Sequence, residues 1–156
     1  MNDLSNTVIN SLIHNYRDFG QRVNTLGNPL TEEQFWTKPY QYGNSFGNLV
    51  LHLTGNLNYY IGSQIAHTGY KRDRELEFSA SYIGQKDRVI KNLNDAVEMV
   101  IDTLKKQNAI DWIQPYSAIG VDDVKDRLSI FIRCAVHFHH HIGQMIYLVK
   151  ELTKTS

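Results

Sequence analysis

The chain has 156 residues, 42% of them hydrophobic, and its 16 lysine and arginine residues balance 16 aspartate and glutamate residues. This length suits a single domain over residues 1–156, and the zero formal charge gives no electrostatic reason to expect a nucleic-acid or anionic-membrane partner. No apolar run is long enough for a transmembrane helix, and the N-terminus lacks the pattern of a signal peptide. The lone cysteine, Cys134, excludes an internal disulfide and fits a reducing compartment, so we expect a cytoplasmic protein.

Four long segments carry apolar residues at the three- and four-residue steps of an amphipathic helix. Between the first two, Thr31 and Gln34 have the spacing of a capping box, which predicts a short helix over residues 32–36. In the last segment, Asp122 and Asp123 fall where they would complement the N-terminal end of the helix dipole. The predicted long helices cover residues 8–26, 45–66, 86–106 and 121–150.

These helices predict an all-α fold, a four-helix bundle with antiparallel or crossover connections. Strand-like alternation is nowhere sustained. The link over residues 67–85 is long enough for a crossover, which would let the second and third long helices lie parallel. The sequence alone leaves both connectivities open.

The stretch HFHHHIGQ, residues 137–144, holds four of the seven histidines of the chain. Advancing the helix by about 100° per residue places His137 within about 40° of His141, in the middle of the apolar stripe. His139 falls about 160° away and His140 about 100° away. Side chains four residues apart on a helix are close enough for two imidazoles to bind one metal ion. The alternative is a pair of hydrogen-bonded core histidines, and we favour the metal because two buried imidazoles need several polar partners.

A third ligand must come from another helix, and His52 is the obvious candidate. Asn48, Asn56 and Tyr59 lie within about 40° of it, at the margin of the apolar face. This row of polar side chains indicates either a polar cavity beside a ligand or the solvated side of the second long helix. The arithmetic does not separate these two interpretations.

Other catalytic patterns are missing from the sequence. There is no HExxH motif and no ExxH pair, and Cys134 is better explained as a small core residue than as a nucleophile. No carboxylate falls on the polar faces of these helices, so the general base is unassigned. His67 is expected at the C-terminus of the second long helix and His14 at a half-buried surface position.

The segment RDRELEF, from Arg72 to Phe78, lies in the long link. Its simpler interpretation is a charged loop whose arginines and acids pair with each other or cap the third long helix. A functional interpretation places Arg72 or Arg74 over a cavity, where either could hold an anionic substrate. We prefer the first.

Three segments, NSFGNLVLHLTGNLNYYI, YKRDRELEF and HFHHHIGQMIYL, resemble the DinB/YfiT-like family of small bacterial helix-bundle proteins. The resemblance implies an up-down-down-up four-helix bundle. It also implies a divalent metal ion held by three histidines, here His52, His137 and His141. Gln144 would lie near this site, where it could orient a ligand or a bound water.

Three histidines and a water molecule are the pattern of catalytic rather than structural zinc sites. Among divalent metals we expect zinc or nickel at such a site. The resemblance implies either a thiol-dependent S-transferase with a low-molecular-weight thiol cosubstrate or a hydrolase, acting on a small-molecule substrate. The alternative is a non-catalytic metal-binding or structural bundle protein. A homodimer is compatible with the nine tyrosines of the chain.

Overall fold

The computed structural model describes residues 2–82 and 85–154. Over these residues the chain is helical and forms no β-strand, apart from one isolated bridge between Pro115 and Asp126. The elements are α1 (Asn2–Gly27), α2 (Glu32–Trp36), α3 (Phe46–Leu57), the π-helix η1 (Asn58–Ser63), α4 (Arg74–Ser79), α5 (Lys86–Lys105), α6 (Ala109–Trp112) and α7 (Arg127–Leu152). The predicted all-α class is therefore confirmed. None of the described helices is long and apolar enough to cross a membrane.

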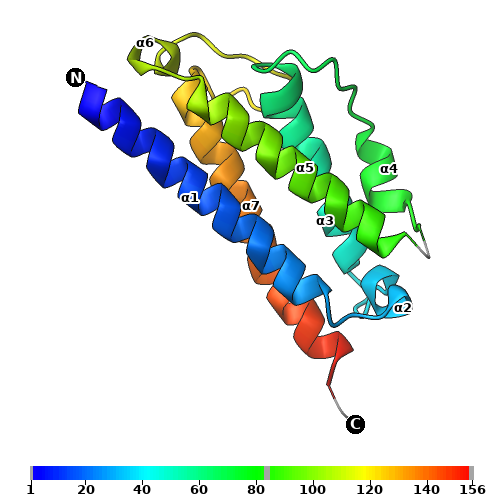
Figure 1. Cartoon of the computed structure of the whole chain (residues 1–156). Helices are drawn as coiled ribbons and strands as arrows, with labels where there is room; N and C mark the ends of the chain where they lie inside the picture. The colour runs from blue at the N-terminus through cyan, green and yellow to red at the C-terminus, as the bar shows by residue number, and fades with distance from the viewer. Residues whose placement is uncertain (1, 83–84, 155–156) are drawn as a thin grey trace.

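The long elements of the fold are α1, α3 continued by η1, α5 and α7. They lie side by side (Figure 1). Helix α1 packs against α5 and α7, and α3 packs against the same two helices. Figure 1 shows α3 and α5 running in one direction and α1 and α7 in the other. The chain can make α3 and α5 parallel because the link after η1 returns along the outside of the helices and carries α4, which packs on α3.

The core lies between these four elements and is rich in aromatic side chains. The largest fully buried residues include Tyr16, Phe35, Phe46, Phe131 and Phe138. Each such ring removes a large apolar area from water, which is the main favourable term in folding. The buried stripe of α7 also contains Cys134, which is 2% exposed, so this residue is part of the core, as expected.

The predicted helix boundaries agree with the structure at the start of the second long helix but not at its end. Ser45 caps α3, since its side chain accepts a hydrogen bond from the backbone N–H of Asn48. Beyond Leu57 the helix widens into the π-helix η1, which ends at Ser63. His67 lies outside the helix, is exposed and has a positive φ of 54°. His14 is likewise exposed rather than half-buried.

The last long helix begins later than the sequence predicts. Asp126 is its N-cap and accepts a hydrogen bond from the backbone N–H of Ser129, so Asp122 and Asp123 lie in the preceding loop. Placing these two acids in the first helical turn was therefore wrong, because a third aspartate provides the cap. The loop turns at Gly120, whose φ of +89° excludes most side chains and whose Cβ would meet the Tyr60 hydroxyl at 2.9 Å.

Candidate metal centre

His52 lies on the face of α3 that α4 covers and is 5% exposed. Asn48, one turn earlier, holds α4 in place by donating hydrogen bonds from its side-chain amide to the backbone carbonyls of Glu77 (3.0 Å) and Ala80 (2.9 Å). Asp73 begins α4 by accepting a hydrogen bond from the backbone N–H of Leu76. These contacts bring Glu77, which is 25 residues from His52 along the chain, to 2.8 Å between its Oε2 and the His52 Nδ1.

The close approach of Glu77 depends on Gly55, because a Cβ at that position would lie 2.0 Å from the Glu77 Oε1. On its other side the carboxylate accepts hydrogen bonds from Arg72, at 2.7 Å from Nε to Oε1 and 2.9 Å from Nη2 to Oε2. Burial alone would raise the pKa of Glu77, but the hydrogen bonds from His52 and Arg72 and the charge of Arg72 lower it below its usual value. Glu77 is therefore a buried carboxylate anion in contact with both cation and imidazole.

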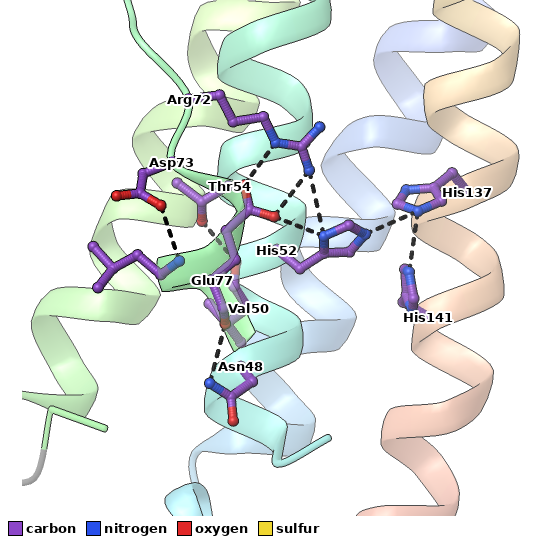
Figure 2. A network of polar contacts seen from close by, with 10 residues as sticks. Asn48, Val50, His52, Thr54, Arg72, Asp73, Glu77, His137 and His141 are labelled. Carbon is purple, nitrogen blue, oxygen red and sulfur yellow. Dashed lines mark hydrogen bonds and ion pairs between the residues drawn. The ribbon is translucent and has the colours of Figure 1, made fainter. Parts of the chain in front are cut away.

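Helix α7 contributes the other two histidines, and Figure 2 shows all three side chains pointing toward one another. The Nε2 of His137 lies 3.1 Å from the Nε2 of His52 and 3.1 Å from the Nε2 of His141. One nitrogen from each of the three residues lies within 4.8 Å of the other two, so together they could hold a metal ion. A tetrahedral ion with nitrogen ligands at about 2.0–2.1 Å would separate those nitrogens by about 3.3–3.4 Å. The two separations of 3.1 Å that involve His137 are close to that value.

Hydrogen bonds on the far side of two rings fix which nitrogen carries the proton. The carboxylate of Glu77 only accepts, so the His52 Nδ1 donates to it, and Arg72 makes the longer contact with this nitrogen, 3.4 Å from its Nη2. The His141 Nδ1 similarly donates to the Gln144 Oε1 at 2.7 Å. In the neutral rings both Nε2 atoms then direct a lone pair at the Nε2 of His137. This is the arrangement by which outer partners orient histidine ligands of a metal.

The cluster contains more acceptors than it can satisfy by itself. The Nε2 of His137 can carry one hydrogen, which cannot fully satisfy the two lone pairs that face it from His52 and His141. Unpaired buried polar atoms are unfavourable, and a cation between the rings would use all three lone pairs. The residues present therefore fit a metal ion.

Two of the three rings are strongly biased toward the neutral form. Burial, followed by the neighbouring His141 and His52, lowers the pKa of His137 to about 3. Burial is also the main reason that the pKa of His141 falls to about 4, although its hydrogen bond to Gln144 acts in the opposite direction. Only the neutral imidazole offers a lone pair to a metal, so these two side chains are ready to bind at neutral pH.

The remaining histidines of α7 lie outside the cluster. His139 is exposed and its ring lies 5.4 Å from the ring of Phe19 on α1. His140 is also exposed, and its ring centroid lies 5.1 Å from that of His141. Helical spacing separates these two residues from the inward pair in the way the sequence predicts.

A cavity of about 480 Å³ opens beside His52 and His137. Of the four polar residues expected around the site, Asn56 and Tyr59 line this cavity and Gln144 bonds to His141. Asn48 instead joins α3 to α4. The lining residues are His52, Asn56, Tyr59, Tyr60, Arg72, Arg74, Ile119, Gly120, Val121, Ile130, Arg133, Cys134 and His137.

Both interpretations of the segment from Arg72 to Phe78 apply in part: its charged residues pair with each other, and its arginines lie at a cavity. Arg72 pairs with Glu77 inside the segment, yet Arg72 and Arg74 also line the cavity. Sequence reasoning missed Glu77 because it searched for a carboxylate on the helices that carry the histidines. The available signal was the position of this glutamate inside a segment already singled out by the family resemblance.

The fold and these contacts define a helical protein with a three-histidine site that could hold a metal ion. A protein-family model described as "Protein of unknown function (DUF1572)" matches residues 3–156, so the chain belongs to that family. Searches of curated proteins and of solved structures gave no match. The likeness to DinB/YfiT-like proteins therefore stays a prediction.

Proposed function

We propose that this protein binds one divalent metal ion, zinc or nickel, through His52, His137 and His141. The observation that carries the proposal is the convergence of three Nε2 atoms, two of which are directed by hydrogen bonds on the opposite side of their rings. Three imidazoles leave at least one coordination position of the ion for a further ligand. The cavity beside His52 and His137 offers room for that ligand.

We further propose that the protein is a metal-dependent enzyme of the DinB/YfiT-like type, either a thiol-dependent S-transferase or a hydrolase. A divalent ion bound there would supply Lewis-acid chemistry, lowering the pKa of a water molecule or of a low-molecular-weight thiol. The chain itself would orient the imidazoles of His52 and His141 through Glu77 and Gln144. Asn56 and Tyr59 would position a small-molecule substrate in the cavity.

Elemental analysis of protein purified without an affinity histidine tag tests the metal site. We expect about one metal ion per chain in the wild type and its loss in His52→Ala, His137→Ala and His141→Ala. His139→Ala is the matched control, because it removes an imidazole from the same helix on the opposite face. No metal in the wild type after incubation with zinc or nickel would refute the proposal, and equal loss from the control would refute the assignment of the ligands.

One observation favours a non-catalytic role as the second candidate. No aspartate or glutamate is present among the described residues that line the cavity, and Glu77 is already engaged by Arg72 and His52. An enzyme would then have to obtain its general base from the substrate, the thiol or the solvent. Turnover of the metal-loaded protein against a panel of thiol and ester substrates separates the two candidates, and a native mass measurement tests whether the non-catalytic protein acts as a homodimer.

A further inference from the structure

The wall of the cavity beside the three histidines is positively charged, although the chain as a whole has no net charge. Arg72, Arg74 and Arg133 line it, and no acidic side chain does so within the described part of the chain. The first two come from the link and the start of α4, whereas Arg133 comes from α7. Three arginines from two parts of the chain therefore line a space of about 480 Å³, a size typical of small-molecule sites.

The three guanidinium groups differ in how far they are already engaged. Arg72 is bound by Glu77 on two of its nitrogens, and its side chain is only 10% exposed. Its role is structural and electrostatic, and much of its charge is balanced by the carboxylate of Glu77. Arg74 and Arg133 are more available to a ligand.

Arg74 is exposed and makes no ion pair among the residues that the structure describes; its guanidinium carbon lies 5.9 Å from the centre of the Phe78 ring. Arg133 pairs with Asp123 at 3.1 Å, but both side chains are largely exposed, so this ion pair is weak and its donors can be exchanged for a ligand. Guanidinium groups bind carboxylates and phosphates through two parallel hydrogen bonds. The cavity thus has two anion-binding groups that no buried acid neutralises.

A neutral polar group completes the cavity wall. Asn56 lines it, is 7% exposed and has a side-chain carbonyl oxygen that is buried without a hydrogen-bond partner among the described residues. A buried amide oxygen without a partner is unfavourable unless a ligand or an ordered water supplies a donor. The arginines and Asn56 lie along the same cavity as His52 and His137, so a ligand held by them would have its reacting part next to the histidines.

We propose that the ligand of this cavity is a small organic anion, a carboxylate or a phosphate ester, whose charged group is bound by Arg74 and Arg133 while a donor group of the same molecule meets Asn56. This inference deepens the proposed function and rests on it in one respect, namely that the three histidines mark the reacting end of the cavity. The charged group of the anion would be bound by Arg74 and Arg133, and not by the metal. Anion binding can therefore be measured with or without metal.

The experiment is a calorimetric titration of the wild-type protein, in metal-free and zinc-loaded form, with succinate and with glycerol 3-phosphate. Succinamide and glycerol are the neutral counterparts of these probes, and the two anions distinguish a carboxylate site from a phosphate site. The variants are Arg74→Gln and Arg133→Gln, with Arg17→Gln as the matched control. Arg17 is exposed on α1, does not line the cavity, and its substitution changes the net charge by the same amount. The metal content of every sample is measured in parallel.

We expect at least one of the two anions to bind the wild type and neither neutral counterpart to do so. Each cavity variant should weaken binding about tenfold or more, since each removes a charged pair of hydrogen bonds, while Arg17→Gln leaves binding unchanged. All three variants should keep their zinc. The inference is overturned if neither anion binds, if the neutral compounds bind equally well, or if Arg17→Gln weakens binding as much as the cavity variants. Arginine-dependent anion binding to a protein that takes up no metal would sustain this inference and refute the proposed function instead.

Discussion

Replacing Glu77 with glutamine removes one negative charge from the centre of the polar network and keeps the size of the side chain. The variant leaves the guanidinium of Arg72, whose side chain is 10% exposed, beside a neutral amide and weakens the hydrogen bond that orients His52. Breaking a buried ion pair by removing one partner costs about 3–5 kcal/mol, and we expect the lower end because Arg72 also faces the cavity. For a domain of this size, a loss of about 3 kcal/mol lowers the Tm by roughly 6–12 °C. Loss of an outer partner should also reduce metal affinity by about 10–100-fold.

Two measurements check this expectation. Circular dichroism melting in a chelator gives the stability of the metal-free protein, and competition with a chromophoric chelator gives the zinc affinity. Glu75→Gln is the matched control, because Glu75 is an exposed acid on the same short helix. The reasoning is refuted if Glu77→Gln melts and binds zinc as Glu75→Gln does.

The acid dependence of the same comparison follows from the lowered pKa of Glu77. A carboxylate whose pKa is lower in the folded than in the unfolded protein stabilises the fold fully above its unfolded pKa, about 4.3 for glutamate. That contribution disappears as the pH falls through the folded pKa. The difference in Tm between the wild type and Glu77→Gln should therefore be constant near neutral pH and shrink below about pH 4. A difference that grows on acidification would contradict the ionised state of Glu77.

Three further outcomes are expected. Gly55→Ala should displace Glu77 and lower zinc affinity by roughly tenfold or more. In the control Gly143→Ala nothing lies within 4 Å of the new methyl group, so this variant should be more stable than the wild type by about 0.5–1 kcal/mol. Equal effects of the two variants in zinc titration and thermal melting would argue against the close approach of Glu77 to α3. Burial raises the pKa of the Cys134 thiol to about 12, so this thiol should not react with a thiol-specific dye at pH 8 until the protein is denatured. Stoichiometric labelling of the native protein would contradict this expectation. Tyr16→Phe should lower the free energy of unfolding by about 1 kcal/mol, because the fully buried Tyr16 hydroxyl donates at 2.7 Å to a backbone carbonyl of α7; an unchanged denaturant midpoint would contradict this.

Periodicity was sufficient to orient His137 and His141, because both lie on the apolar stripe of one long helix, but it left two interpretations of the face of His52 open. It could not place Glu77, since α4 has six residues and its contact with α3 is determined by Gly55 and Asn48 rather than by a pattern within α4 itself. The start of α7 was missed for a similar reason. Three aspartates precede it, and the one that caps the helix is decided by the path of the loop around Gly120, not by local charge.

The π-helix η1 also limits what a helical wheel can show. One extra residue in a turn rotates all later side chains by about 100° relative to a regular α-helix. Positions up to Leu57 follow the predicted face, so His52 and Asn56 were placed correctly relative to each other. Beyond that residue the periodic argument loses accuracy: Tyr59, which it places on the row of His52, does line the cavity, whereas the position of Tyr60 at the cavity comes from the structure alone.

Glu77 is shared between two halves of one site, the histidines on one side and Arg72 on the other. Polarisation of His52 by a cation would draw the carboxylate of Glu77 toward the imidazole and weaken its hydrogen bonds to Arg72. The charge of the Arg72 guanidinium would then be less neutralised, and the cavity wall would attract an anion more strongly. By thermodynamic linkage, if the cation raises the affinity for the anion by some factor, the anion raises the affinity for the cation by the same factor. A protein built in this way would hold its metal most tightly when its cavity is filled, so occupancy by both would be cooperative even though the two ligands bind to different side chains.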